Sequence, residues 1–210
     1  MARVKICGFT RERDVDRAVE AGVDAVGAIV DVPVDSPREI DPGRARSIFE
    51  RVPPFVSTVL VTMPASVERA EERIGQVGPD AVQVHGGLSP EAVAELATRD
   101  VTVIAAVDHD EDRIEAYATA ADALLVDSTD EAGAGGTGRT HDWDATRALA
   151  QLDVPLVLAG GLTPENVAEA VETVEPYAVD AASGVEAEPG RKDPDRVRSF
   201  VGAATGVGDR

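Results

Sequence analysis

A cysteine, an aspartate and a histidine of this 210-residue chain each lie where a predicted strand ends, and all three types can transfer protons. Cys7 is the only cysteine and stands between the apolar alternation of residues 3–7 and Gly8. A lone free cysteine is either a small, inert buried residue or a reactive thiol. Asp127 follows the apolar run ALLV and precedes a glycine-rich stretch. Its carboxylate could cap a turn or face a site.

Three more polar residues are candidates for ligand binding. Gln83 and His85 occupy alternate positions at the end of one predicted strand, so their side chains point the same way. His85 could instead bond a backbone carbonyl, and Gln83 could satisfy a buried backbone group. Arg38, in the segment DSPREI after the second predicted strand, is either a surface arginine or a contact for a ligand anion.

The elements that must position these residues follow a repeating pattern. Short β-branched runs alternate with segments of helical period, and turn-forming residues lie between them. Strands are predicted over residues 3–7, 25–30, 56–61, 81–85, 101–107, 123–127, 154–159 and 177–182. Helices are predicted over residues 10–22, 41–52, 66–75, 89–97, 110–120, 142–152, 163–174 and 192–204. The pairs Ser89–Pro90 and Thr163–Pro164 predict helix starts, with an N-cap residue followed by proline at the first helical position. Gly22 and Gly75 predict helix ends.

Strands this uniformly apolar suit a parallel sheet covered on both faces. The repeat therefore predicts an α/β fold, a single-domain (β/α)₈ TIM barrel over residues 1–204, with residues 205–210 as a frayed tail. A doubly wound open sheet is the alternative, but its first turn is usually richer in glycine than CGFTRER. In a barrel, strand ends at one face line the active site, so the candidate side chains could share one cavity.

Two segments near the C-terminus are typical of phosphate binding. One contains Gly160 and Gly161, and the other contains Ser183 and Gly184. Small residues expose backbone N–H groups, and a short helix start adds partial positive charge. Both segments follow the last two predicted strands, which is where phosphate often binds in barrels.

Composition excludes several functional classes. The chain has 39 Asp+Glu against 20 Lys+Arg, a net charge of −19, which disfavours binding to nucleic acid. A hydrophobic content of 43% with clear periodicity excludes a disordered acidic chain. An acidic surface poor in lysine is typical of adaptation to high salt. No segment has the form of a signal peptide or membrane helix, so we expect a cytoplasmic protein without a membrane partner.

Several segments together resemble the phosphoribosylanthranilate isomerases of tryptophan biosynthesis. They are KICG (5–8), SPREI (36–40), VQVHG (82–86), LLVDS (124–128), GGTGRTHDW (135–143), LAGGLTPENV (158–167) and SGVEAEPGRKD (183–193). Each is weak alone, but their joint occurrence in this order is specific. The resemblance implies a (β/α)₈ barrel, a small-molecule substrate, and neither a metal nor an organic cofactor.

The resemblance also implies a reaction and its residues. It makes Cys7 the general base and Asp127 the general acid of an Amadori rearrangement of N-(5-phosphoribosyl)anthranilate. The acid protonates the furanose ring oxygen, which opens the sugar to an iminium, and the base removes the C2 proton. Lys5 and Arg38 are the side-chain candidates for capturing the substrate's anions.

The chain departs from the family pattern in two places. Ala182 precedes Ser183 and Gly184 where two serines are usual, so one hydroxyl contact to phosphate is missing. The segment 27–38 lacks the usual aromatic residue before its proline and carries Asp35 where lysine is common. We expect a looser and less positive mouth.

Other functions stay open from the residues alone. A metal-dependent ribulose-phosphate epimerase would need about four His/Asp ligands at strand ends. Only His85 is predicted at such an end, since His109 and His141 fall in loops or helix starts. A non-catalytic barrel that binds phosphorylated metabolites, and an isomerase acting on a related aminoaldose of histidine biosynthesis, are the further alternatives.

Overall fold

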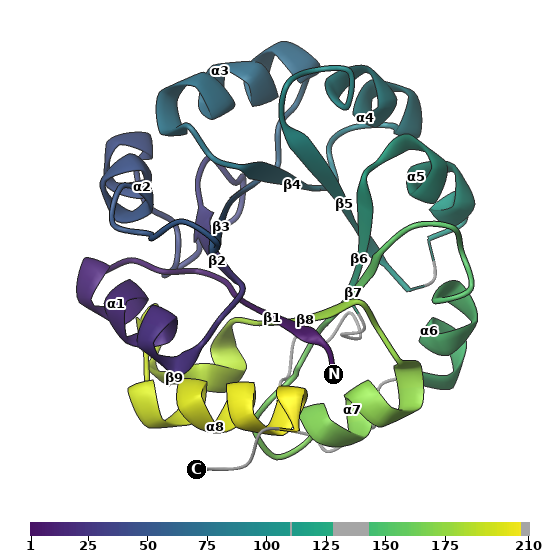
Figure 1. Ribbon diagram of the computed structural model, residues 1–210. Coiled ribbons are helices and arrows are strands. Elements are labelled where there is room, and N and C mark those ends of the chain that lie inside the picture. The colour runs from purple at the N-terminus through teal and green to yellow at the C-terminus, as the bar shows by residue number, and fades with distance from the viewer. Residues whose placement is uncertain (110, 128–142, 207–210) are drawn as a thin grey trace.

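The computed structural model describes residues 1–109, 111–127 and 143–206, and within them it confirms the predicted barrel (Figure 1). Parallel strands lie in sequence order around a closed ring, and the last strand pairs with the first. The strands are β1 (Arg3–Ile6), β2 (Ala25–Ile29), β3 (Ser57–Thr62), β4 (Ala81–His85), β5 (Thr102–Asp108), β6 (Ala123–Asp127), β7 (Leu156–Ala159) and β8 (Ala178–Ala181).

Helices surround the ring of strands and cover its outer face (Figure 1). They are α1 (Glu12–Ala21), α2 (Pro42–Phe49), α3 (Val67–Val77), α4 (Pro90–Leu96), α5 (Ile114–Ala120), α6 (Trp143–Leu149), α7 (Val167–Val174) and α8 (Pro194–Thr205). A short 3₁₀ helix, η1 (Ser183–Val185), and a hairpin of β9 (Glu186–Glu188) and β10 (Arg191–Lys192) separate β8 from α8. None of the described helices is long and apolar enough to cross a membrane.

The two-residue period of each strand divides its side chains between two cores. In β1, Val4 and Ile6 belong to the large core between strands and helices and are fully buried. Cys7, on the alternate side, belongs to a smaller core inside the barrel. Apolar residues on both faces make the strands suit only a covered parallel sheet.

Aspartates that precede β2, β4 and β6 stabilise the rim of the barrel at which the strands begin. The carboxylate of Asp24 accepts a hydrogen bond from Val4 N at 2.8 Å, and that of Asp122 accepts one from Val103 N at 2.7 Å. Asp80 accepts in the same way from the backbone N–H of β3. Backbone donors at strand starts thus gain charge-assisted partners.

Two of the predicted helix boundaries are confirmed. Ser89 caps α4 by accepting from Ala92 N, with Pro90 at the first helical position. Gly22 ends α1 with a left-handed φ of 91°, a conformation that glycine adopts without steric cost.

Two other helix boundaries were predicted wrongly. α3 runs through Gly75, and Gly78 ends it with a φ of 71°. α7 begins at Val167 rather than at Thr163, because Thr163 N donates to Asn166 Oδ1 at 2.8 Å and the intervening residues form a turn. A Thr-Pro pair signals a turn as well as it signals a helix start.

The predicted boundary between the barrel and its tail stays a prediction. Thr205 is the last residue of α8, and Gly206 caps it with a φ of 67°. Residues 207–210 lie outside the described residues.

Candidate active site

The two strands that close the barrel place a buried ion pair inside it. Lys5 of β1 and Asp180 of β8 are register partners, and Lys5 Nζ donates to Asp180 Oδ2 at 2.7 Å. Their side chains are only 5% and 9% exposed. Burial works against the charged lysine, but the Asp180 carboxylate holds the pKa of Lys5 above its ordinary value. Lys5 is therefore a fixed cation whose charge is locally balanced.

Cys7 follows β1 on the inward side and is buried beside this pair. Its backbone N–H donates to Ala181 O at 2.9 Å. Gly27 of β2 leaves space for the sulfur, because a Cβ at that position would lie 3.0 Å from Cys7 Sγ. Burial raises the pKa of the Cys7 thiol, and the charges of Lys5 and Lys192 oppose this only in part. The thiol is consequently protonated at neutral pH in the free protein.

Arg38 lies in the loop between β2 and α2, and its side chain packs over Gly8. Gly8 has a φ of 77°, and a Cβ there would come within 2.7 Å of Arg38 Cδ, so the position requires glycine. The guanidinium donates two hydrogen bonds of 2.8 Å to Glu186 of β9. Lys192 Nζ also donates to Glu186, at 2.7 Å. The structure therefore gives Arg38 a carboxylate partner beside the position of Cys7.

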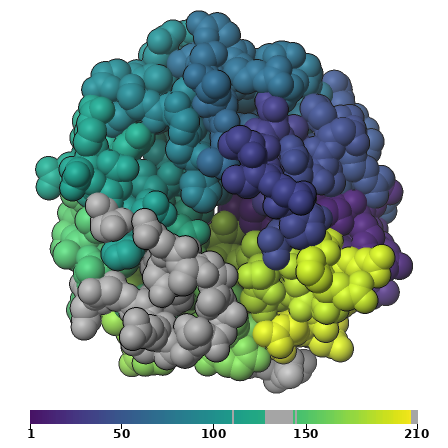
Figure 2. Space-filling model, turned by 180° about the vertical axis from the view of Figure 1, so that it is seen from behind, coloured from purple at the N-terminus to yellow at the C-terminus, as the bar shows by residue number. Residues whose placement is uncertain are grey.

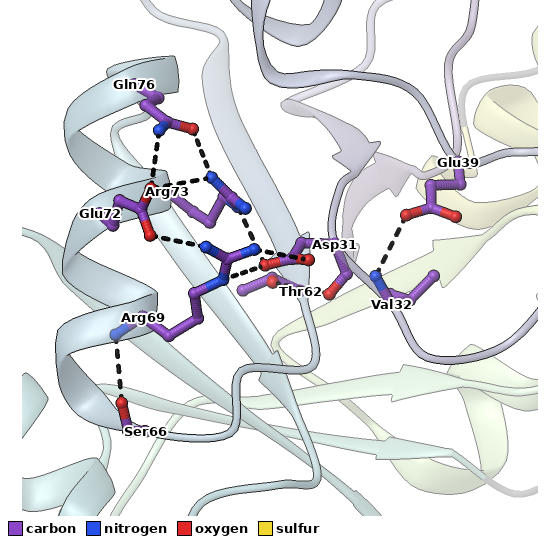
Figure 3. Close-up of polar contacts among 9 residues, drawn as sticks. All are labelled: Asp31, Val32, Glu39, Thr62, Ser66, Arg69, Glu72, Arg73 and Gln76. Atoms are coloured by element: carbon purple, nitrogen blue, oxygen red, sulfur yellow. Dashed lines mark hydrogen bonds and ion pairs between the residues drawn. The ribbon is translucent and has the colours of Figure 1, made fainter.

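One carboxylate fixes the loop between β2 and α2 to α3 (Figure 3). Asp31 has a φ of 60°, which is uncommon for a residue with a side chain. It accepts from Arg69 Nε at 2.7 Å and from Arg73 Nε at 2.9 Å. Hydrogen bonds from Arg69 are the main reason why the pKa of Asp31 lies below its ordinary value. Farther along the loop, Glu39 accepts from Val32 N at 3.2 Å.

Gln83 and His85 lie on the inward face of β4, as the alternation predicts. Gln83 is 4% exposed, and among the described residues its Oε1 has no hydrogen-bond partner. Such a buried acceptor is costly unless a ligand or water satisfies it. His85, the last residue of β4, is half-buried.

Asp127 is the last residue of β6 and is half-buried. Leu125 belongs to the core inside the barrel, so Asp127, two residues later, faces the same side. Its register partner is Asp108, the last residue of β5, which sequence reasoning did not select. In the closed ring, β7 and β8 lie between β6 and β1 on one side and four strands lie between them on the other. Asp127 and Cys7 therefore approach the barrel mouth from different directions.

The two predicted phosphate segments touch one another. Gly160 and Gly161 follow β7 with φ values of 93° and 59°. Gly184 lies in η1, where a Cβ would come within 1.9 Å of the Leu162 carbonyl oxygen. Arg196 of α8 donates to Gly184 O at 2.9 Å. Ser183 and Gly184 are thereby held against the loop after β7.

The match to known proteins covers nearly the whole chain. The sequence model of the family "N-(5'phosphoribosyl)anthranilate (PRA) isomerase" matches residues 4–203. The chain belongs to this family. It is 61% identical to the N-(5'-phosphoribosyl)anthranilate isomerase of Haloarcula marismortui over 203 residues, or 96% of this chain and 95% of that protein. It is 56% identical to the Halobacterium salinarum isomerase over 100% of this chain and 98% of that protein.

Solved structures of phosphoribosyl anthranilate isomerases superpose closely on the barrel. The Thermotoga maritima isomerase matches with a TM-score of 0.89 and 39% identity, covering 99% of this chain and 100% of that chain. An isomerase solved in complex with reduced 1-(o-carboxyphenylamino)-1-deoxyribulose 5-phosphate matches with a TM-score of 0.85 and 38% identity, over the same shares of both chains.

Both departures from the phosphoribosylanthranilate isomerase pattern lie at the barrel mouth. Ala182 contributes its backbone, since its carbonyl accepts from Lys192 Nζ at 3.0 Å. Asp35 is exposed in the loop that carries Arg38. Their effect on affinity stays a prediction.

The structure also bears on the metal-dependent alternative. His109 lies in the turn that directly follows β5, outside the strand, as the sequence predicts. Among the described residues, no three His, Cys, Asp or Glu side chains lie where they could hold one metal ion. His141 lies outside those residues.

Sequence reasoning missed four residues that surround the predicted ones: Gly27, Asp180, Glu186 and Lys192. A signal existed for Asp180, because it is the only charged residue of the apolar run YAVDAA. Lys192 is one of only two lysines in the chain. Gly27 and Glu186 carry no local signal, since their neighbours come from distant parts of the sequence.

Proposed function

We propose that this protein catalyses the Amadori rearrangement of N-(5-phosphoribosyl)anthranilate to 1-(2-carboxyphenylamino)-1-deoxyribulose 5-phosphate, a step of tryptophan biosynthesis. One observation carries the proposal. A member of this isomerase family has a thiol and a carboxylate, Cys7 and Asp127, on inward positions at the carboxyl ends of β1 and β6. Acting on a charged metabolite also fits the cytoplasmic location expected from the sequence.

In the proposed mechanism the two groups act in sequence. Asp127 protonates the furanose ring oxygen as the C1–O bond breaks, which gives an iminium at C1. Cys7, as the thiolate, then removes the proton from C2, and the enolamine relaxes to the C2 ketone as C1 gains a proton. Substrate and product are isomers, so no oxidant is needed. The Lys5 ammonium, which acts to lower the pKa of Cys7, stabilises the thiolate form.

Substrate anions would bind at neighbouring parts of the mouth, because β8 pairs with β1 in the closed ring. The backbone N–H groups around Gly160, Gly161, Ser183 and Gly184 are proposed to hold the phosphate. Arg38, beside β1 and β2, is then left for the ring carboxylate. Gln83 Oε1, buried and unpaired among the described residues, is proposed to accept from a sugar hydroxyl.

A fluorescence assay of substrate consumption by the purified protein tests this function. We expect turnover of phosphoribosylanthranilate that is unchanged by a chelator. Loss of activity in chelator would favour a metal-dependent epimerase. Binding without turnover would favour a metabolite-binding barrel. A parallel assay with the histidine-pathway aminoaldose tests how strict the substrate choice is.

The pH dependence of thiol reactivity should report the pKa of Cys7. Because burial raises this pKa, the thiolate fraction is small at neutral pH and grows as pH rises towards the pKa. We expect the rate of Cys7 alkylation by iodoacetamide to increase by about tenfold per pH unit through this range, because the thiolate is the nucleophile. Cys7 is the only cysteine, so ultraviolet titration of its thiolate gives an independent pKa, with Cys7→Ser as the blank. An alkylation rate that stays constant between neutral pH and the measured thiol pKa would contradict the raised pKa.

The anchor of the loop between β2 and α2 gives a second expectation. Asp31→Asn keeps a residue that tolerates positive φ but removes the charge that two arginines hold. The loop that carries Arg38 should loosen, raising KM roughly three- to tenfold with kcat within about twofold. Glu72→Gln is the matched control, because Glu72 accepts from Arg69 at 2.7 Å but lies outside the loop. Equal KM changes in the two variants, measured by steady-state kinetics, would reject the assignment.

A further inference from the structure

Glu186 holds two cations at once inside the barrel mouth. Its Oε1 accepts from Arg38 Nε at 2.8 Å and from Lys192 Nζ at 2.7 Å, while its Oε2 accepts from Arg38 Nη2 at 2.8 Å. The Glu186 side chain is 5% exposed and that of Lys192 is 2% exposed. Burial works against the carboxylate, but the bonds from Arg38 and Lys192 hold the pKa of Glu186 below its ordinary value.

This arrangement joins two segments that lie far apart in the sequence. Figure 2 shows the loop after β2, in dark blue, beside the segment after β8, in yellow. A Cβ at Gly190 would come within 2.5 Å of Pro37 O, and Thr10 Oγ1 donates to Gly190 O at 2.7 Å. The hairpin of β9 and β10 therefore packs against Pro37, the residue before Arg38. This contact fixes the position of the loop after β2 relative to the hairpin.

Only one edge of the Arg38 guanidinium is used by Glu186. The fork of Nε and Nη2 takes both carboxylate oxygens, which sets the plane of the group. Among the described residues, Nη1 has no hydrogen-bond partner. The other edge of the guanidinium thus remains available for a second anion.

We propose that Glu186 is a positioning residue that makes this site select a carboxylated substrate, by fixing Arg38 so that its free edge meets the ring carboxylate. The inference rests on the proposed function, in which C2 of the sugar lies at Cys7 and the phosphate at the loops after β7 and β8. The ring carboxylate is the substrate anion that remains, and Arg38 is a cation at the mouth whose Nη1 has no partner among the described residues. Glu186 acts through Arg38 and touches no reacting atom.

The chain offers a closely matched pair of variants. Glu186→Gln replaces an oxygen acceptor with an N–H₂ donor that faces the donors of Arg38 and Lys192. Glu188→Gln is the control on the same strand, because the Glu188 side chain is 64% exposed and pairs with Arg191. Glu186→Asp keeps the charge, but its side chain is too short to reach both cations. It replaces Glu186→Gln in the test if that variant does not fold.

The test compares two ligands by calorimetric titration of the whole protein. One is the reduced product analogue, and the other is the same compound without the ring carboxyl group. Glu186→Gln should bind the carboxylated ligand roughly tenfold or more weakly and the other ligand unchanged. Glu188→Gln should match the wild type with both. In an Arg38→Ala background, which itself should mainly weaken binding, Glu186→Gln should add no further selective loss.

Two results would overturn the inference. Equal weakening for both ligands would make Glu186 a structural residue, and unchanged binding in both Glu186→Gln and Glu186→Asp would remove it from the site. Failure of the proposed function has a different signature, because the wild-type protein itself would then neither bind the analogue nor turn over phosphoribosylanthranilate.

Discussion

Cys7→Ala and Asp127→Ala are each expected to lower kcat by at least ~10²-fold, the usual contribution of a positioned proton-transfer group. The reason is that an Amadori rearrangement requires one group to protonate the ring oxygen and another to remove the C2 proton. Neither Lys5, held by Asp180, nor Arg38, held by Glu186, can serve as a base while protonated. Steady-state and single-turnover kinetics measure the change.

Controls must show that these variants fold. Cys7 lies in the core inside the barrel, so its replacement by alanine removes one buried sulfur and should cost about 1–2 kcal/mol of unfolding free energy. Circular dichroism and thermal unfolding check this for both variants. Near-normal turnover in either folded variant would refute its assignment as acid or base.

Both kcat/KM and melting temperature are expected to rise with KCl from ~0.1 M to ~2 M. The substrate carries a phosphate and a carboxylate, and the chain has a net charge of −19, so at low salt the overall field repels the ligand. Raising salt to ~1 M shortens the screening length to ~3 Å, which removes this repulsion and the self-repulsion of the fold but spares direct contacts. We expect an increase of at least ~10-fold in kcat/KM.

The structure separates the cations that could contact the substrate from the surface charges that create the long-range field. The only two lysines of the chain, Lys5 and Lys192, are 4% and 5% exposed and lie in the candidate site. Surface cations are arginines, many of them paired with carboxylates, as Arg51 is with Asp16 at 2.7 Å. Turnover and thermal unfolding are measured in a KCl titration, with sucrose as a non-ionic control. Sucrose is excluded from the protein surface but does not screen charge, so the comparison isolates the effect of charge screening. Activity that falls steadily with salt while the fold stays intact would contradict the prediction.

Much of the fold could be predicted because its signals are local. The alternation of apolar strands with helices of 3.6-residue period predicted the (β/α)₈ barrel, and the capping pair Ser89–Pro90 predicted a helix start correctly. The misplaced boundaries at Gly75 and Thr163 show the limit of local signals. A glycine can lie inside a helix when a later glycine supplies the left-handed cap, and a Thr-Pro pair can begin a turn.

The sequence alone also determined which strand ends carry polar side chains. Gln83, His85 and Asp127 occupy the expected strand positions, and Cys7 lies one residue beyond the end of β1. Residues two apart on a strand share a face, and parallel strands end at one rim. Their type and position required no knowledge of their partners. Their catalytic and binding roles stay predictions for the experiments above.

Only the tertiary structure decided what those side chains contact. Lys5 meets Asp180 because closure of the ring sets β1 beside β8, and Arg38 meets Glu186 because two loops from opposite ends of the chain pack together. The pKa of a buried group depends on these partners and on the depth of burial, and neither is written in the local pattern of residues. The sequence thus determined the fold and the kinds of groups at its rim, whereas closure of the barrel decided which charges are neutralised and which remain for a ligand.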